Sequence, residues 1–200
     1  MTRGRLEAFS DAVIAIAMTI MVLELKVPHG MDWESLRPLL PIFFSYVLSY
    51  TYLGIYWNNH HHMLHTCDTI NGRILWANLH LLFWLSLIPV ATAWLGDFPS
   101  SRIPTITYGA VLAGAAVAYY VLQLQIIAHQ GPHSKLRAAV GRDLKGKGSV
   151  VLYLAALPLC FVHAAISISV YWLVALLWLV PDRRIESRLH QATTKADGKS

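Results

Sequence analysis

The chain has 200 residues, of which 56% are hydrophobic and only 14% are charged, and its formal net charge is +5. Soluble domains usually carry about 25% charged residues, so this composition excludes an ordinary soluble domain and indicates an integral membrane protein. The two cysteines, Cys67 and Cys160, lie in different segments. The sequence therefore predicts neither a disulfide framework nor a thiolate metal site.

Apolar windows of roughly 20 residues, the length that crosses a bilayer as a helix, recur along the chain. The last window, 148–181, contains no Asp, Glu, Lys or Arg. As a single helix it would be about 51 Å long, well beyond a hydrocarbon core of about 30 Å. We therefore predict two helices in this window, with a turn near residues 163–169.

The prediction is an all-α integral membrane protein of six transmembrane helices, at about 8–27, 36–62, 72–96, 103–129, 147–164 and 166–182. One membrane domain would cover residues 1–186, and the polar residues 187–200 would form a cytoplasmic tail. We expect no cleavable signal peptide, because the first apolar run lacks a small-residue cleavage pattern and continues into Glu24 and Lys26.

Basic residues are concentrated in alternate connections, and this asymmetry predicts the orientation. They precede the first span and occur again between spans two and three, between spans four and five, and after span six: Arg3, Arg5, Arg73, Lys135, Arg137, Arg142, Lys145, Lys147, Arg183, Arg184, Arg188, Lys195 and Lys199. The other connections hold only Lys26, Arg37 and Arg102. Both termini are therefore predicted to be cytoplasmic, and the positive charge indicates orientation rather than nucleic-acid binding.

One stripe of the first span has helical spacing. Ala12, Ile16, Thr19 and Leu23 recur at steps of four, three and four, and Ile20 borders them. In a single chain such a stripe is an ordinary packing face, and the pattern alone favours that interpretation. Around a symmetry axis each residue would instead form a ring, and apolar rings can gate a pore by dewetting.

Ionisable residues stand at both ends of this span. Ser10 and Asp11 precede its most apolar part, so they are predicted to cap the N-terminus of the helix. Alternatively, Asp11 and Arg5 belong to a buried polar network, because ionisable residues at membrane depth are usually paired or face water. Glu24 is interpreted as a plain interfacial charge or as a cation attractor at the outer mouth.

Histidines gather at the end of the second span, at positions 60, 61, 62 and 65. Consecutive helical residues point about 100° apart, so only His61 and His65 share a face, and no metal site is expected. His80, inside the third span, is expected to pack and to form hydrogen bonds beside the first helix. No cluster of nucleophiles, acids or metal ligands shares one depth, so we expect neither an enzyme nor a cofactor.

Several of these residues carry a family resemblance. Arg5-x-x-x-Phe9-Ser10-Asp11, followed by Ala15-Ile16, Thr19 and Leu23-Glu24-Leu25, resembles the signature of the endosomal/lysosomal potassium channel family (transmembrane protein 175 type). The stretches YWNNHHHMLH at 56–65 and NLHLLFWLSLIPVATAWLG at 78–96 are also similar. The resemblance covers all six spans, although the last two match mainly by hydropathy. It implies the prokaryotic form, a homotetramer in the cytoplasmic membrane.

In such a channel, four copies of the first helix line the pore, and no loop of the TVGYG kind serves as a filter. The sequence contains no TVGYG motif. The resemblance places the constriction at Ile16 and the threonine implicated in cation selectivity at Thr19. Ile20 and Leu23 match further apolar pore positions. Ala15 stands where some members have a polar residue, so we do not expect this position to contribute to selectivity in this chain.

The resemblance also implies a polar network that holds the first helix in place. Its members would be Arg5, Phe9, Ser10 and Asp11 on that helix, His60 or His61 on the second, and His80 beside them. The leading hypothesis is thus passive conduction of potassium ions by a homotetramer embedded in membrane lipids. The alternative is a secondary transporter for a cation or metal that uses second-helix histidines together with Asp11.

Overall fold

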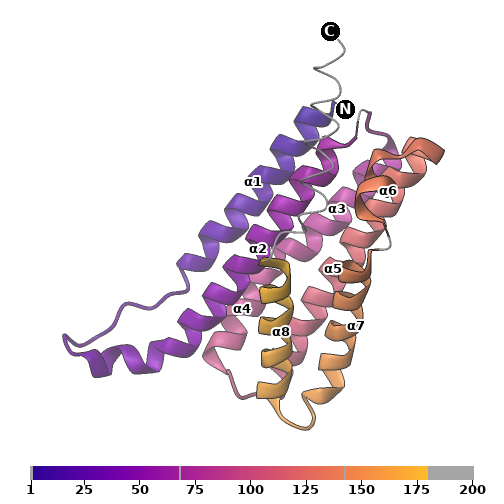
Figure 1. Cartoon of the computed structure of the whole chain (residues 1–200). Helices are drawn as coiled ribbons and strands as arrows, with labels where there is room; N and C mark the ends of the chain where they lie inside the picture. Colours follow the sequence, from indigo (N-terminus) through magenta and orange to yellow (C-terminus); the bar gives the residue numbers. More distant parts are fainter. Residues whose placement is uncertain (1, 68, 142, 180–200) are drawn as a thin grey trace.

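The first helix, α1, spans Arg3–Val22 in the computed structural model of the chain, which describes residues 2–67, 69–141 and 143–179 (Figure 1). Its N-cap is Thr2, whose backbone is extended. Ser10 and Asp11 lie inside this helix, so the interpretation of these two residues as an N-terminal cap is wrong. The helix begins and ends about five residues earlier than the predicted span 8–27. Its earlier start is explained by charged first turns, which can be helical outside the hydrocarbon core.

The second span consists of two helices in sequence. A 3-10 helix, η1 (Trp33–Leu39), leads directly into the long helix α2 (Leu40–His65). Asp32 caps η1, and its carboxylate accepts a hydrogen bond of 3.0 Å from the backbone N–H of Ser35. Pro41 lies in the first turn of α2, where its missing N–H costs no helical hydrogen bond.

The third span is broken near a proline. It comprises α3 (Gly72–Ser86) and α4 (Ile88–Asp97), which meet at Leu87. Pro89 has no N–H to donate to the carbonyl of Leu85, and its ring crowds that carbonyl, which explains the break. Asn71 caps the start of α3 by accepting a hydrogen bond of 2.9 Å from the N–H of Ile74.

The remaining helices are α5 (Arg102–Gln130), the short η2 (Gly131–His133) and α6 (Lys135–Val140), and then α7 (Leu144–Leu159) and α8 (Ala164–Leu179). The last apolar window does contain two helices. Their turn lies at residues 160–163, earlier than the predicted turn at 163–169. Pro158 stands in the last turn of α7, where it has no N–H to donate to the carbonyl of Leu154 and can bend the helix.

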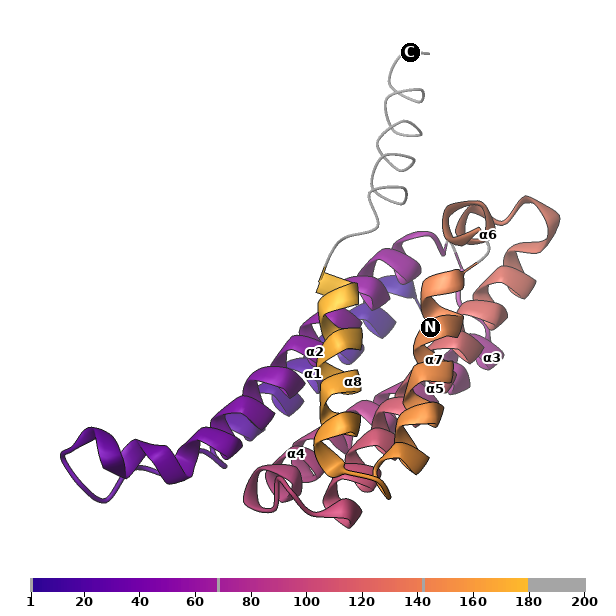
Figure 2. The ribbon, with the colours of Figure 1, turned by 60° about the horizontal axis from the view of Figure 1, so that its bottom comes forward.

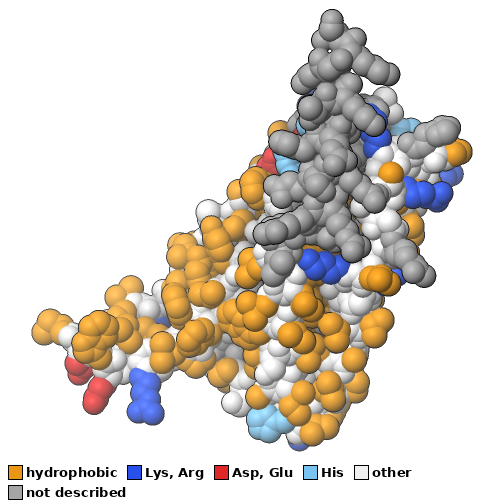
Figure 3. Space-filling model, viewed as in Figure 1, with side chains coloured by type: hydrophobic (Ala, Val, Ile, Leu, Met, Phe, Trp, Pro, Cys, Tyr) orange, Lys and Arg blue, Asp and Glu red, His pale blue; other side chains and the backbone are white. Residues whose placement is uncertain are grey.

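The helices run antiparallel in a bundle, and α5 packs against α3, α4, α7 and α8 (Figures 1 and 2). The N-terminus of α1 lies at the same end of the bundle as α6 (Figure 1). In the part of the chain that is described, three helical segments are long and apolar enough to cross a membrane: Trp33–His65, Gly72–Asp97 and Arg102–Gln130. Hydrophobic side chains cover much of the face in Figure 3, with charged side chains mostly near its ends. The chain is an integral membrane protein.

Buried tyrosines join α2, α5 and α8 in the interior of the bundle. The hydroxyl of Tyr52 donates to the backbone oxygen of Tyr171 at 2.5 Å, and that of Tyr171 donates to the backbone oxygen of Thr105 at 3.2 Å. The hydroxyls of Tyr108 and Ser49 lie 2.9 Å apart. Each buried tyrosine hydroxyl of this group therefore has a hydrogen-bond partner, as a stable core requires.

Gly109 on α5 makes room for one of these tyrosines. A Cβ atom at this position would lie 2.0 Å from the hydroxyl oxygen of Tyr171, which is fully buried. We expect Gly109→Ala to destabilise the detergent-solubilised protein by about 1–3 kcal/mol, the usual cost of overpacking. Thermal unfolding should show a melting temperature lower by several degrees. The matched control is Gly54→Ala on α2, where a Cβ would meet nothing within 4 Å. This control should melt at or above the wild-type temperature, and equal melting of the two variants would contradict the expectation.

Candidate pore helix and its polar anchors

Helix α1 has one face buried against the rest of the chain and one face exposed. The buried residues are Leu6, Ser10, Ile14, Ala17 and Met21. Their spacing of three or four residues places them on one side of the helix, and that side contacts α2, α3 and α4.

The apolar stripe found in the sequence lies on the exposed face. Ile16, Ile20 and Leu23 are 56%, 45% and 80% exposed, and Ala12 and Thr19 are also exposed. The stripe is therefore not an internal packing face of the single chain. It is available to face lipid, another protein or another copy of the chain.

Thr19 is the polar member of this stripe. Its hydroxyl donates to the backbone oxygens of Ala15 and Ile16, at 3.0 Å each. Since the proton is directed back to the helix, the lone pairs of the Thr19 oxygen remain on the exposed side. Thr19 can thus offer an acceptor oxygen to a cation or to water.

A buried hydrogen-bond chain fixes the opposite face of α1. The amide nitrogen of Asn78 on α3 donates to Ser10 Oγ at 2.9 Å, and its oxygen lies 2.7 Å from His60 Nε2 on α2. All three side chains are fully buried. An amide oxygen can only accept, so His60 Nε2 must carry the proton. Ser10 Oγ in turn donates to the backbone oxygen of Leu6 at 2.9 Å.

His60 retains one unused polar atom. Within the described residues, its Nδ1 has no hydrogen-bond partner. Among the described residues its side chain forms a hydrogen bond with Asn78 alone, so this bond orients the ring. The chain Ser10–Asn78–His60, which we call the buried anchor, connects three helices at one level.

A second set of contacts joins α1 to α2 closer to the surface. Glu7 accepts from His61 Nδ1 at 2.7 Å, and Asp11 accepts from Trp57 Nε1 at 3.1 Å. Glu7 and Asp11 are four residues apart, as are Trp57 and His61, so each pair lies on one helix face. In addition, Arg3 donates to the backbone oxygen of His65 at 3.3 Å.

The structure thus brings together some of the residues that the sequence singled out, and separates others. Ser10 and His60 share the buried anchor, whereas Asp11 and His61 belong to the surface contacts. His80 accepts a hydrogen bond of 3.0 Å from Trp84 of its own helix. Arg5 and Phe9 are exposed, and neither forms a hydrogen bond or ion pair with a described residue.

Three contacting residues were not singled out from the sequence: Asn78, Glu7 and Trp57. For Glu7 and Trp57 the sequence held a usable pattern: Glu7 lies four residues before Asp11, and Trp57 lies four residues before His61. This spacing places each pair on one helix face. Asn78 was marked only by being an amide at the start of an apolar run.

The histidines of α2 point in several directions. The rings of His61 and His65 stack with centroids 6.0 Å apart, which agrees with the predicted shared face. No group of three or more His, Cys, Asp or Glu side chains that could hold a metal ion occurs in the described part of the chain.

Comparison with known proteins points to one family. A family model described as "Endosomal/lysosomal potassium channel TMEM175" matches residues 5–89, a range that contains all but the first residues of α1 and all of α2 and α3. A potassium channel of Chryseobacterium sp. (strain P1-3) is 52% identical over 191 residues, which cover 96% of this chain and 100% of that protein. A potassium channel of Streptomyces collinus (strain DSM 40733 / Tue 365) is 30% identical over 184 residues, which cover 86% of this chain and 89% of that protein.

The fold is similar to a solved structure as well. The crystal structure of a lysosomal potassium-selective channel TMEM175 homolog from Chamaesiphon minutus matches with a TM-score of 0.77 and 26% sequence identity. The match covers 89% of this chain and 96% of that one. Sequence and fold therefore point to the same family.

Proposed function

The chain belongs to the endosomal/lysosomal potassium channel family TMEM175, and we propose from this membership that it conducts potassium ions passively through a pore lined by α1. The relatives named above are potassium channels, and the family is one of ion channels rather than enzymes. The proposed protein is a homotetramer in the cytoplasmic membrane of a prokaryote, with potassium as the permeant ion and no cofactor.

One observation carries the proposal: the stripe of α1 is exposed in the single chain while the opposite face is held by polar anchors. An exposed apolar face alone would suit contact with lipid. Lipid contact does not require the other face to be fixed by a buried hydrogen-bond chain and two surface contacts. A pore requires such fixation, because small changes in the position of its lining residues change its width.

In the proposed assembly, each stripe residue forms a ring around the axis. Ile16 makes the narrowest ring, and Ile20 and Leu23 extend the apolar section on one side. Thr19 supplies the nearest side-chain oxygens, and its hydroxyl geometry leaves them available. An apolar ring offers no ligands that replace hydration water, so partial dehydration would cost less for potassium than for the smaller sodium ion.

The distribution of basic residues supports the proposed orientation. At the end of the bundle where α1 begins and α7 begins, the described residues include Arg3, Arg5, Arg73, Lys135, Arg137, Lys145 and Lys147. The opposite end holds Lys26, Arg37 and Arg102, and Lys26 pairs with Asp97 at 2.9 Å. The end with more basic residues would face the cytoplasm. The N-terminus lies at this end and would therefore be cytoplasmic. An even number of membrane crossings would return the C-terminus to the same side.

Recording in planar bilayers tests this function. Purified protein is placed between KCl on one side and NaCl at equal concentration on the other. We expect a current whose reversal potential has the sign that results when potassium is more permeant than sodium. Current should flow without a proton gradient, and the double variant His61→Gln/His65→Gln should still conduct, because a glutamine at position 61 can still donate a hydrogen bond to Glu7. Uptake that requires a proton gradient and is lost in this variant would favour the transporter alternative and contradict the channel proposal.

A further inference from the structure

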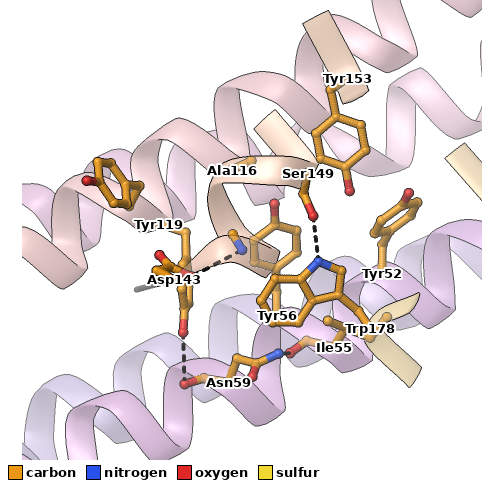
Figure 4. A pocket seen from close by; sticks show the side chains of 12 residues that line it. Tyr52, Ile55, Tyr56, Asn59, Ala116, Tyr119, Asp143, Ser149, Tyr153 and Trp178 are labelled. Carbon is orange, nitrogen blue, oxygen red and sulfur yellow. Dashed lines mark hydrogen bonds between the residues drawn. The ribbon is translucent and has the colours of Figure 1, made fainter. Parts of the chain in front are cut away.

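A cavity lies inside the single chain, away from the stripe of α1. It lies between α2, α5, α7 and α8, near the start of α7, and is partly open to the surface (Figure 4). Its volume is about 40 Å³, room for about three water molecules. The proposed pore uses none of its lining residues, so the cavity needs a separate explanation.

Aromatic residues from four helices are half of the twelve that line it. They are Tyr52 and Tyr56 on α2, Tyr119 and Tyr120 on α5, Tyr153 on α7 and Trp178 on α8. The rings of Tyr56 and Tyr119 meet edge to face with centroids 6.0 Å apart, as do those of Tyr52 and Tyr153 at 6.2 Å. Several ring faces around one small space form a surface that attracts cations.

Two polar donors in this wall already have partners within the chain. The hydroxyl of Tyr119 donates to the backbone oxygen of Asn59 at 3.3 Å, and Trp178 Nε1 donates to Ser149 Oγ at 2.8 Å. These two donors are therefore satisfied within the chain, and a ligand would meet ring faces and acceptor oxygens of the wall.

A single carboxylate completes the wall. Asp143 accepts from the backbone N–H of Gly146 at 3.1 Å and from the amide of Gln123 at 3.0 Å. Both donors are neutral, so these bonds orient the carboxylate and do not cancel its charge. Its backbone is left-handed, with φ at 45°, a conformation uncommon outside glycine. A Cβ on residue 146 would lie 2.6 Å from the carboxylate, so the glycine is needed for this arrangement.

The chain itself shows that one of these rings attracts a positive charge. Lys145 Nζ lies 5.3 Å from the ring centroid of Trp178, within the range of a cation–π interaction. The ammonium group of Lys145 therefore lies beside the cavity, where it would compete with another cation.

We propose that this cavity is a binding site for a small organic ammonium ion, such as a methylated amine. Rings and a carboxylate exclude an anion, and a cation is attracted by both the ring faces and the carboxylate, whereas a neutral ligand is not. Strongly hydrated inorganic cations need several oxygen ligands, whereas methylated ammonium ions are weakly hydrated and bind well to aromatic walls. The cavity lies at the proposed cytoplasmic end of the bundle, so it would bind amines from inside the cell.

Titration calorimetry tests the site directly. Purified full-length protein in detergent is titrated with tetramethylammonium chloride, and KCl replaces it at equal ionic strength in the reference. We expect saturable binding to the wild type and affinity about tenfold lower in Asp143→Asn and in Trp178→Leu. Asparagine tolerates the left-handed backbone and still accepts from Gly146, so Asp143→Asn should fold normally. Lys145→Met should bind more tightly, because a competing cation is removed.

Two controls separate this site from the pore and from unspecific effects. Trp94→Leu, on α4 and outside the cavity, should bind like the wild type. Ile16→Asn alters the proposed constriction and should also leave the affinity unchanged. Absence of saturable binding to the wild type, or wild-type affinity in Asp143→Asn, would overturn the proposal and would leave the channel function untouched.

Discussion

Replacing Ile16 by asparagine should greatly reduce the preference for potassium over sodium and should raise the single-channel conductance. The substitution exchanges an apolar ring for a ring of amides, one from each copy in the proposed assembly. Amide oxygens replace hydration water for both ions, so the dehydration difference at the constriction shrinks. With potassium and sodium on opposite sides, the reversal potential should move close to zero. Conductance should rise several-fold because the section most prone to dewetting becomes polar.

The control for this variant is Ile103→Asn. Ile103 on α5 is 60% exposed, close to the 56% of Ile16, but it lies outside the proposed pore. It should reproduce the wild-type reversal potential and conductance. If Ile16→Asn also did so, Ile16 could not be the constriction.

Replacing Asn78 by leucine should destabilise the protein more than any surface substitution. The change removes both bonds of the buried anchor, and neither His60 nor Ser10 can reach water instead. Loss of partners for buried polar groups costs about 1–3 kcal/mol for each group, so a total of about 2–6 kcal/mol is expected for the two groups. Thermal unfolding in detergent should show a clear decrease in melting temperature. The current per reconstituted protein should also fall, since α1 loses a fixed contact with α2 and α3.

Asn58→Leu provides the same chemical change at an exposed position of α2. We expect its melting temperature to remain within about one degree of the wild type, since surface changes rarely exceed ~0.5 kcal/mol. The buried anchor would be unimportant for stability if Asn78→Leu unfolded at the same temperature as Asn58→Leu.

The sequence predicts the helices better than it predicts the contacts between them. The span predicted at 103–129 is the helix Arg102–Gln130, because an unbroken apolar window between Ser101 and Gly131 leaves few alternatives. The predicted span 8–27 corresponds to Arg3–Val22. Hydropathy marks the part of a helix that suits hydrocarbon, and it says little about the charged turns that continue the helix into water.

The contacts depend on how each helix is rotated about its axis, and tertiary packing sets that rotation. Sequence spacing grouped the stripe of Ile16, Thr19 and Leu23 correctly as one face, but could not decide whether the face was buried or exposed. Similarly, four histidines in one short stretch concealed that His60 points inward while His61 points toward Glu7. The partner of His60 is Asn78, whose position on α3 relative to α2 no local pattern gives.

Chemical modification of Thr19→Cys during recording tests most directly whether α1 lines the pore. The native cysteines Cys67 and Cys160 are both buried, so the wild type serves as an unreactive reference. A positively charged methanethiosulfonate reagent should abolish most of the potassium current of Thr19→Cys, because each modified side chain adds bulk and a positive charge to the conduction path. Val151→Cys, on the exposed surface of α7, should remain unaffected. An unchanged current in Thr19→Cys, together with block in Val151→Cys, would place the ion path elsewhere and contradict the account.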